Sequence, residues 1–326
     1  MKKKFGLFIS LLAIVPVLTV FLAAPAAMAQ AKYPSKPITV IVPWSVGGST
    51  DMVARVGAKI LQDKWGVSVN VTAKPGGKGI PGTVEALDAA PNGYTLLADA
   101  DGSNAVPAAW GKGVPFKIED RTYIAKIAEF PWVFATRAGV PWKSLDDVAA
   151  AIKANPGEVK WGWLGGTAGA DGPVGQLKDA LKKKGIDVSK VKFVTYPGGA
   201  DLVTALAGGH VDIGSASTTS VGPMFSAGKI KLIAITGNRR YAGYPDLKTT
   251  VEQGWKTVTF QGHVGFAGPK GLPPEIVKAL EDAVKASIDT PEIAKELAKI
   301  GAFPAFAGSK DFRTYVLELA KELKEL

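Results

Sequence analysis

Short runs of β-branched and aromatic residues alternate with helix-period segments after Pro34, and this alternation limits the possible folds more than any other feature of the chain. We expect strands at Ile38–Trp44, Val67–Ala73, Tyr94–Asp99, Val191–Tyr196, Val211–Ser215 and Ile230–Thr236. Between strands, apolar residues recur at helical spacing, as in Met52–Leu61 and Leu145–Ile152. The pattern is typical of an α/β protein with mainly parallel sheets.

The C-terminal part of the chain has an almost wholly helical pattern. Three segments carry a proline in the first turn or a serine at the N-cap: Pro274–Ile288, Pro291–Ile300 and Ser309–Leu326. Two earlier segments, Pro131–Thr136 and Thr257–Phe260, are extended in pattern without a following tight turn. We interpret these two segments as hinge strands between two lobes.

Two crossings of the chain between lobes define the expected domain organisation. Residues 32–132 and 261–326 would form lobe 1, and residues 133–260 would form lobe 2. A cleft between two lobes is a common place for a small-molecule site. We therefore predict two α/β lobes with a ligand cleft between them.

Residues 1–29 have the pattern of a cleavable secretory signal peptide. Lys2–Lys4 precede the apolar run Phe5–Leu22, and small residues lead to a cleavage point after Ala29. The alternative is a membrane anchor, because the run approaches the roughly 20 apolar residues that span a bilayer. Pro16 interrupts the run, and small residues rather than basic ones follow it, which favours cleavage. We predict export to the periplasm.

Composition excludes several classes of function. The chain has no cysteine, so it cannot be a lipid-anchored lipoprotein and has neither disulfides nor thiolate metal sites. Its formal net charge is +10, and loss of three leader lysines leaves +7. The basic residues are spread along helices rather than clustered, and export separates the protein from DNA, so we expect no nucleic-acid partner. The positive surface favours encounter with small anions.

Catalytic motifs are missing from the sequence. It contains no G-x-S-x-G elbow, no H-E-x-x-H motif and only two histidines, His210 and His263. We interpret His210, in a turn before a strand, as a surface or structural residue. We expect a protein that is not an enzyme and that needs neither a cofactor nor a metal.

Glycine-rich turns between strands and helices are the most informative segments. The first, Trp44–Arg55, contains free backbone N–H groups at the start of a predicted helix, where a carboxylate or phosphate is favoured. The alternative is a simple N-cap, because Ser49, Thr50 and Asp51 are all good capping residues. Similar turns follow at Trp163–Gly172 and Tyr196–Asp201. Because ligands bind at the carboxyl ends of parallel strands, turns from two lobes can face one cleft.

At these turns the sequence resembles the periplasmic substrate-binding proteins of tripartite tricarboxylate transporters, also called Bug proteins. The resemblance runs from Tyr33 to the C-terminal helices. Its landmarks are YPSKPITVIVPWSVGGSTDMVAR from Tyr33, KPGGKG from Lys74, APNGYTLL from Ala90, GGT from Gly165, YPGGADLVTALAGGHVD from Tyr196, GKIKLIAIT from Gly228, PDLKTTVEQG from Pro245 and GPKGLPPEIV from Gly268.

The resemblance implies a two-lobed periplasmic binding protein of the type II, Venus-flytrap kind, which closes on a small carboxylate and delivers it to a membrane permease. We expect a freely diffusing monomer. Position in the resemblance, and for His263 its place after the second predicted hinge, give these ligand-binding candidates: Trp44, Ser45, Gly47, Gly48, Ser49, Thr50, Asp51, Asp101, Ser103, Asn104, Gly165, Gly166, Thr167, Gly198, Gly199, Asp201, Ser215 and His263. No catalytic or metal-binding residue is assigned.

Departures from the family pattern bear on the identity of the ligand. Trp44-Ser45-Val46 replaces the Phe and Pro-Pro pattern that is frequent in the family, and no histidine follows Thr167. Asp99 and Asp101 flank the first-lobe turn; if they face the cleft, they disfavour a polyanion and favour a ligand with hydroxyl or ammonium groups. The alternative is that these acids cap a turn or face solvent.

Tryptophans are the other clue to the ligand. We expect packing roles for Trp65, Trp110, Trp142 and Trp255. The four at strand ends or at the hinge are candidates for lining the cleft: Trp44, Trp132, Trp161 and Trp163. An aromatic or hydroxylated acid would suit such a cleft. The alternative function is a periplasmic sensor that presents its ligand to a two-component system, and the sequence does not separate transport from sensing.

Overall fold

The computed structural model describes residues 33–166 and 168–326. The predicted signal peptide and Thr167 lie outside the described residues. None of the helices between Tyr33 and Leu326 is both long and apolar enough to cross a bilayer.

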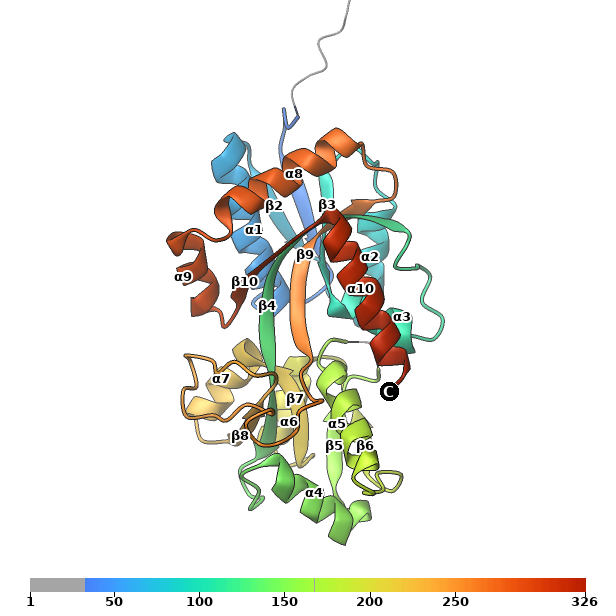
Figure 1. Cartoon of the computed structure of the whole chain (residues 1–326), viewed down its shortest axis with the longest axis vertical. Coiled ribbons are helices and arrows are strands. Elements are labelled where there is room, and N and C mark those ends of the chain that lie inside the picture. The colour runs from blue at the N-terminus through green and yellow to red at the C-terminus, as the bar shows by residue number, and fades with distance from the viewer. Residues whose placement is uncertain (1–32, 167) are drawn as a thin grey trace, which may run out of the picture. The chain divides into compact units, whose positions relative to one another are not determined.

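The first of two connected sheets, with its helices, forms lobe 1 (Figure 1). Its strand order is β2-β1-β3-β9-β4, and β10 also pairs with β4. The strands are β1 (Ile38–Val42), β2 (Val69–Ala73), β3 (Thr95–Ala100), β4 (Arg121–Arg137), β9 (Gln261–Pro269) and β10 (Phe303–Gly308). The helices are α1 (Ser49–Trp65), α2 (Ile80–Leu87), α3 (Ala105–Trp110), α8 (Pro274–Ser287), α9 (Pro291–Lys299) and α10 (Ser309–Lys324), with 3-10 turns at Gly77–Gly79 and Asp101–Ser103.

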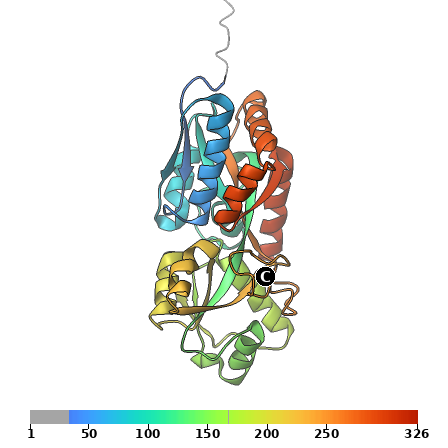
Figure 2. The same cartoon turned by 90° about the vertical axis from the view of Figure 1, so that its left-hand side faces the viewer.

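The second sheet, with its helices, forms lobe 2 (Figures 1 and 2). In it, β7 pairs with β4 and with β5, β5 pairs with β6, and β8 pairs with β4. The strands are β5 (Lys160–Trp163), β6 (Lys192–Thr195), β7 (Ile213–Ser217) and β8 (Ile230–Ile235). The helices are α4 (Leu145–Ala154), α5 (Asp171–Lys183), α6 (Gly199–Ala207) and α7 (Thr218–Ser226), with a 3-10 turn at Pro156–Glu158. The predicted two-lobed α/β fold is confirmed.

Strand β4 belongs to both sheets. Its first half pairs with β9 and β10, and its second half, from Trp132 onward, pairs with β7 and β8. The extended segment Pro131–Thr136 is therefore part of a longer strand. The second predicted hinge strand, Thr257–Phe260, is wrong: the backbone N–H groups of Thr259 and Phe260 donate to Gln176 Oε1, and β9 begins only at Gln261. The exact lobe boundaries stay a prediction.

Strand β9 was not predicted because glycines interrupt its apolar pattern. Large neighbours occupy the space that side chains would need: a Cβ on Gly262 would lie 2.2 Å from the Phe130 ring. At Gly265, a Cβ would lie 2.4 Å from the backbone oxygen of Ala125 on β4 and 2.6 Å from Phe312. The glycines permit close approach of β9 to its neighbours.

We expect Gly265→Ala to lower the free energy of unfolding by about 3 kcal/mol, because the clash is with the backbone of a central strand that cannot move without breaking its ladder. Urea unfolding of the purified protein measures the loss. Gly157→Ala is the matched control, since a Cβ there meets nothing within 4 Å. Equal midpoints for the two variants would contradict this account of β9.

Candidate functional site

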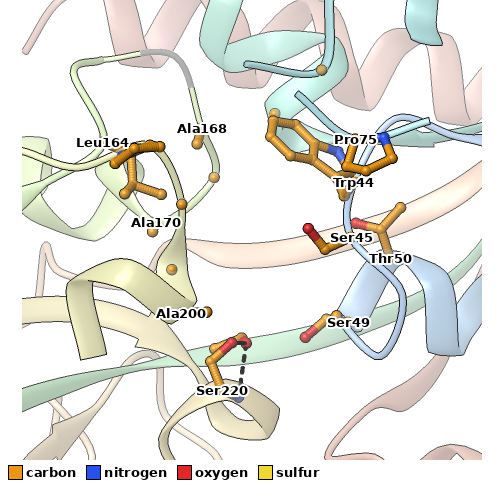
Figure 3. A pocket seen from close by; sticks show the side chains of 18 of the residues that line it. Trp44, Ser45, Ser49, Thr50, Pro75, Leu164, Ala168, Ala170, Ala200 and Ser220 are labelled. Atoms are coloured by element: carbon orange, nitrogen blue, oxygen red, sulfur yellow. Dashed lines mark hydrogen bonds between the residues drawn. The ribbon is translucent and has the colours of Figure 1, made fainter. Parts of the chain in front are cut away.

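A cavity of about 730 Å³ lies between the lobes and is lined by both of them. Figure 3 shows part of its lining, with Trp44 and Pro75 facing Leu164 and Ala168 across the space, and Ser49 and Ser220 nearer one end. The lining residues are Trp44 to Thr50, Pro75 to Gly79, Asp101, Gly102, Phe130, Trp132, Leu164, Ala168 to Ala170, Thr195 to Asp201, Ser217 and Ser220.

The first turn of α1 contributes a positive end to this cavity. Gly48 is the N-cap, so Ser49, Thr50 and Asp51 do not occupy that position, although Asp51 accepts the N–H of Gly47 from within the first turn. First-turn N–H groups have no acceptor within their own helix and carry the positive end of the helix dipole. Ser49 and Thr50 line the cavity at this end.

Helix α6 of lobe 2 presents a comparable uncapped end to the same space, and α7 presents a capped one. Helix α6 begins after Gly198, which is an N-cap without a side-chain hydrogen bond, and Gly198, Gly199 and Asp201 line the cavity. Helix α7 begins after Ser217, whose Oγ accepts the N–H of Ser220 and lies 2.8 Å from its hydroxyl. Helix ends from both lobes therefore favour an anion in the cavity.

Trp44 forms an apolar wall that depends on two glycines. A Cβ at Gly79 would lie 3.0 Å from the six-membered ring of Trp44, and a Cβ at Gly102 would lie 2.6 Å from it. Gly79 also has a φ of +77°, which favours glycine. Phe130, Trp132 and Tyr196 add further aromatic surface. The neighbouring glycines thus hold the indole of Trp44 at the cavity.

Lys78 is the single basic residue in the described lining. It adopts a φ of +58° in the glycine-rich loop before α2, and a Cβ on Gly165 of lobe 2 would lie 3.5 Å from its Nζ. Within residues 33–166 and 168–326 it forms no ion pair. It therefore places an exposed ammonium group across the cavity, toward lobe 2.

Asp101 is a buried carboxyl group at the junction of the lobes. Its side chain is 3 % exposed, and its Oδ2 has no hydrogen-bond partner in the described part of the chain. The pKa of Asp101 is raised to about 7, mainly by burial and to a smaller extent by the nearby charge of Asp99, while hydrogen bonds from the backbone N–H groups of Gly102 and Asp101 oppose the rise. The indole N–H of Trp132, also buried at the cavity, has no described partner.

Asp99 does not face the cavity, which answers one question that the sequence left open. Its carboxylate pairs with Arg121 at 2.6 Å, and both side chains are fully buried. Ser103 donates to Asp99 at 2.8 Å and accepts the N–H of Ala100, so Ser103 holds the turn and is not in the cavity lining.

Several other predicted ligand contacts are drawn into structural networks. Asp51 turns away from the cavity because it accepts the N–H of Gly47 and pairs with Arg55 through both oxygens. Asn104 lies 3.1 Å from His263 Nε2 and caps α3, so neither residue reaches the cavity. Burial lowers the pKa of His263 to about 3, which leaves the ring neutral.

The glycine-rich turn of lobe 2 is organised by a carboxylate of the protein itself. Asp171 accepts the N–H groups of Leu164, Gly166 and Ala168, the position at which a ligand anion was expected. Gly165 and Gly166 do not belong to the cavity lining. Ser215 is buried on β7 and also lies outside the cavity lining. Thr167 is not among the described residues.

Of the predicted candidates, the structure brings together ten in the lining: Trp44, Ser45, Gly47, Gly48, Ser49, Thr50, Asp101, Gly198, Gly199 and Asp201. Of the tryptophans, Trp44 and Trp132 line the cavity, whereas Trp161 is buried in the core of lobe 2 and Trp163 packs on Phe193. Lys78 lines the cavity but was not predicted to do so, although the KPGGKG landmark contains it. That the ten predicted residues in the lining contact a ligand stays a prediction.

The fold and the cavity define a class of protein, the two-lobed α/β binding proteins. The family model described as "Tripartite tricarboxylate transporter family receptor" matches residues 53–326. The chain therefore belongs to the tripartite tricarboxylate transporter receptor family.

Individual relatives agree with this assignment. The chain is 31% identical over 310 residues to a Cupriavidus necator protein described as "UPF0065 protein in gbd 5'region", covering 94% of this chain and 91% of that protein. The solved structure of the periplasmic binding protein BugD is similar with a TM-score of 0.77 and 26% identity, covering 90% and 97% of the two chains. An R. palustris protein solved with adipate has the same fold, with a TM-score of 0.81, 24% identity and coverage of 90% and 96%.

Proposed function

We propose that this protein is a periplasmic solute-binding protein that captures a small organic carboxylate between its lobes and delivers it to the membrane subunits of a tripartite transporter. One observation carries the proposal: uncapped N-termini of α1 in lobe 1 and α6 in lobe 2 line one cavity. Each end favours an anion by about 0.3–1 kcal/mol, and more when partly buried. A carboxylate between them would connect the two lobes.

Contacts across the cavity support closure of the lobes around a ligand. The hydroxyl groups of Ser49 on α1 and Thr219 on α7 lie 3.2 Å apart. The carboxyl group of Asp101 contacts the loop around Gly169 in lobe 2. A ligand that touches both lobes would add to these contacts and stabilise the closed arrangement.

A thermal-shift panel of mono-, di- and tricarboxylates tests the proposal on the purified chain from Gln30 to Leu326. At 100 times its Kd, a bound acid stabilises the folded state by about 2.7 kcal/mol, which raises the melting temperature measurably. We expect a shift with at least one acid and recovery of that acid unchanged. No shift with any member of a broad panel would count against the proposal.

A role in delivery is separated from sensing by cellular measurements. We expect deletion of the gene to lower uptake of the bound acid when the transporter genes are expressed from a constitutive promoter. Loss of gene induction with normal uptake would instead indicate that the protein presents its ligand to a sensor.

We expect Thr219→Val to weaken binding of the best acid of the panel about three- to fivefold, because it removes one cross-lobe hydrogen bond, worth about 1 kcal/mol. Titration calorimetry gives the affinity, and stopped-flow fluorescence should assign the change to faster release. Thr204→Val is the matched control, since the hydroxyl group of Thr204 donates to the carbonyl of Ala200 within α6 and, among the described residues, to no group of lobe 1. Equal affinities for the two variants would show that the contact does not contribute.

A further inference from the structure

One end of the cavity has serine hydroxyl groups near helix ends, and the other end has large apolar side chains on both sides. In Figure 3, Ser49 and Ser220 lie on opposite sides of one end of the cavity, whereas Trp44 and Pro75 face Leu164 across the space toward the other end; Ser45 and Thr50 lie between Ser49 and Trp44. An acid held by its carboxylate at the helix ends would direct its remaining atoms toward the apolar residues. A volume of about 730 Å³ leaves room there for a ring or a long hydrocarbon body.

The charges in the lining suit one carboxylate better than two or three. Against the single cation Lys78, the described lining contains two acids, Asp101 and Asp201. Lys78 is exposed, and an exposed ion pair contributes little because water screens it. Asp101 is buried, so its negative charge acts through a medium that screens much less.

Asp101 lies beside the apolar part of the cavity. The neighbouring glycine, Gly102, packs against the Trp44 ring, and Asp101 itself meets Gly169 of lobe 2, which also contacts Trp132. Its Oδ2 has no donor among the described residues to neutralise it. A second carboxylate placed at the apolar end would lose its water next to this like charge, which is a strong penalty.

We propose that this site selects a monocarboxylate with an apolar, preferably ring-shaped body over di- and tricarboxylates, and that Asp101 is the residue that rejects a second carboxylate. The inference rests on the proposed function and goes beyond it by naming the ligand class. A ring would pack against the indoles of Trp44 and Trp132. A hydroxyl or ammonium group on the body is compatible with Asp101, because either can donate a hydrogen bond to it.

Two matched pairs of acids test the selection by titration calorimetry at pH 8. Benzoate and terephthalate share a ring and differ in the second carboxylate, and hexanoate and adipate do the same for an open chain. We expect benzoate to bind at least tenfold tighter than terephthalate, and hexanoate tighter than adipate. Equal or tighter binding of the diacid in both pairs would overturn the inference and leave the proposed function intact. Binding of no acid in a broad carboxylate panel would instead remove the proposed function.

Asp101→Asn tests the named residue. We expect the variant to reduce the benzoate-to-terephthalate preference at least threefold, mainly by improving terephthalate binding. Asp289→Asn, which removes a surface charge in an exposed loop, is the matched control and should keep the wild-type preference. An unchanged preference in Asp101→Asn would show that Asp101 does not discriminate.

The pH dependence of the wild-type preference gives a second measure that needs no variant. The ionisable and charged groups that face Asp101 are Asp99, with its partner Arg121, and Tyr315 from α10, while Lys78 and Asp201 line the same cavity. Because burial raises the pKa of Asp101 to about 7, its charge develops mainly between pH 6 and pH 8. The preference for benzoate should grow over this interval in the wild type and stay flat in Asp101→Asn. A flat wild-type profile would contradict the assignment.

Discussion

The Gly169→Ala protein is expected to fold normally and to lose about 30- to 100-fold in affinity for its acid. A Cβ at residue 169 would lie 2.2 Å from Oδ2 and 2.6 Å from Cγ of Asp101, and 2.7 Å from the Trp132 ring. Overpacking of this kind typically costs about 1–3 kcal/mol, and the expected loss in affinity corresponds to about 2–2.7 kcal/mol of this range. Because Gly169 belongs to lobe 2 and Asp101 to lobe 1, the added methyl group would act as a wedge against closure.

The wedge explanation requires affinity and stability to respond differently. Opening the lobes relieves the clash without unfolding either core, so the urea midpoint of Gly169→Ala should stay close to that of the wild type. Gly157→Ala, on the surface of lobe 2, is the control for both measurements. Unchanged affinity, or a loss of stability that matches the loss of affinity, would exclude the wedge.

The second large effect concerns the pH dependence of stability. In the folded protein, burial raises the pKa of Asp101 from its ordinary value of 3.8 to about 7, so the folded protein binds this proton more tightly than the unfolded chain does. Its contribution to stability is therefore fully present below pH 4 and is lost as the pH rises to 7 and above. With about 1.4 kcal/mol for each pKa unit, the loss reaches up to about 4 kcal/mol. Opening of the lobes limits the loss, because it hydrates the carboxyl group without unfolding.

Asp101→Asn should remove this dependence and raise the melting temperature of the ligand-free protein at pH 8. His263 acts in the opposite direction: its pKa is lowered to about 3, so its contribution is present above pH 6.5 and is lost as the pH falls toward 3. The difference between wild type and Asp101→Asn, followed from pH 4 to pH 8 in urea, isolates Asp101. A difference that does not change with pH would contradict the raised pKa of this group.

The fold was predictable where each strand is a compact apolar run followed by an amphipathic helix. Strands β1, β2 and β3 lie within the predicted runs or one residue beyond them, and α1 follows as expected. Strand β9 was missed because Gly262 and Gly265 replace the side chains that periodicity would detect. Strand β10 was missed because its short run lies between predicted helices and gains its partner, β4, only through long-range pairing.

The candidate site was predictable where backbone groups make it and less so where side chains do. The loops at Gly48 and Gly198 line the cavity because a glycine-rich turn before a helix fixes the position of the N–H groups. Side-chain roles depend on partners that are distant in sequence, as with Asn104, which lies against His263. Asp171 was not predicted to bind its own turn, because a local carboxylate and a ligand carboxylate suit the same amides equally well.

A crystal structure of the protein with the tightest acid of the panel would show whether the helix ends of the two lobes hold the ligand. We expect electron density for the acid inside the cavity, with its carboxylate within hydrogen-bond distance of first-turn N–H groups of α1 and α6 and its body against Trp44. An acid bound outside the cavity, or one whose carboxylate points away from both helix ends, would contradict this expectation.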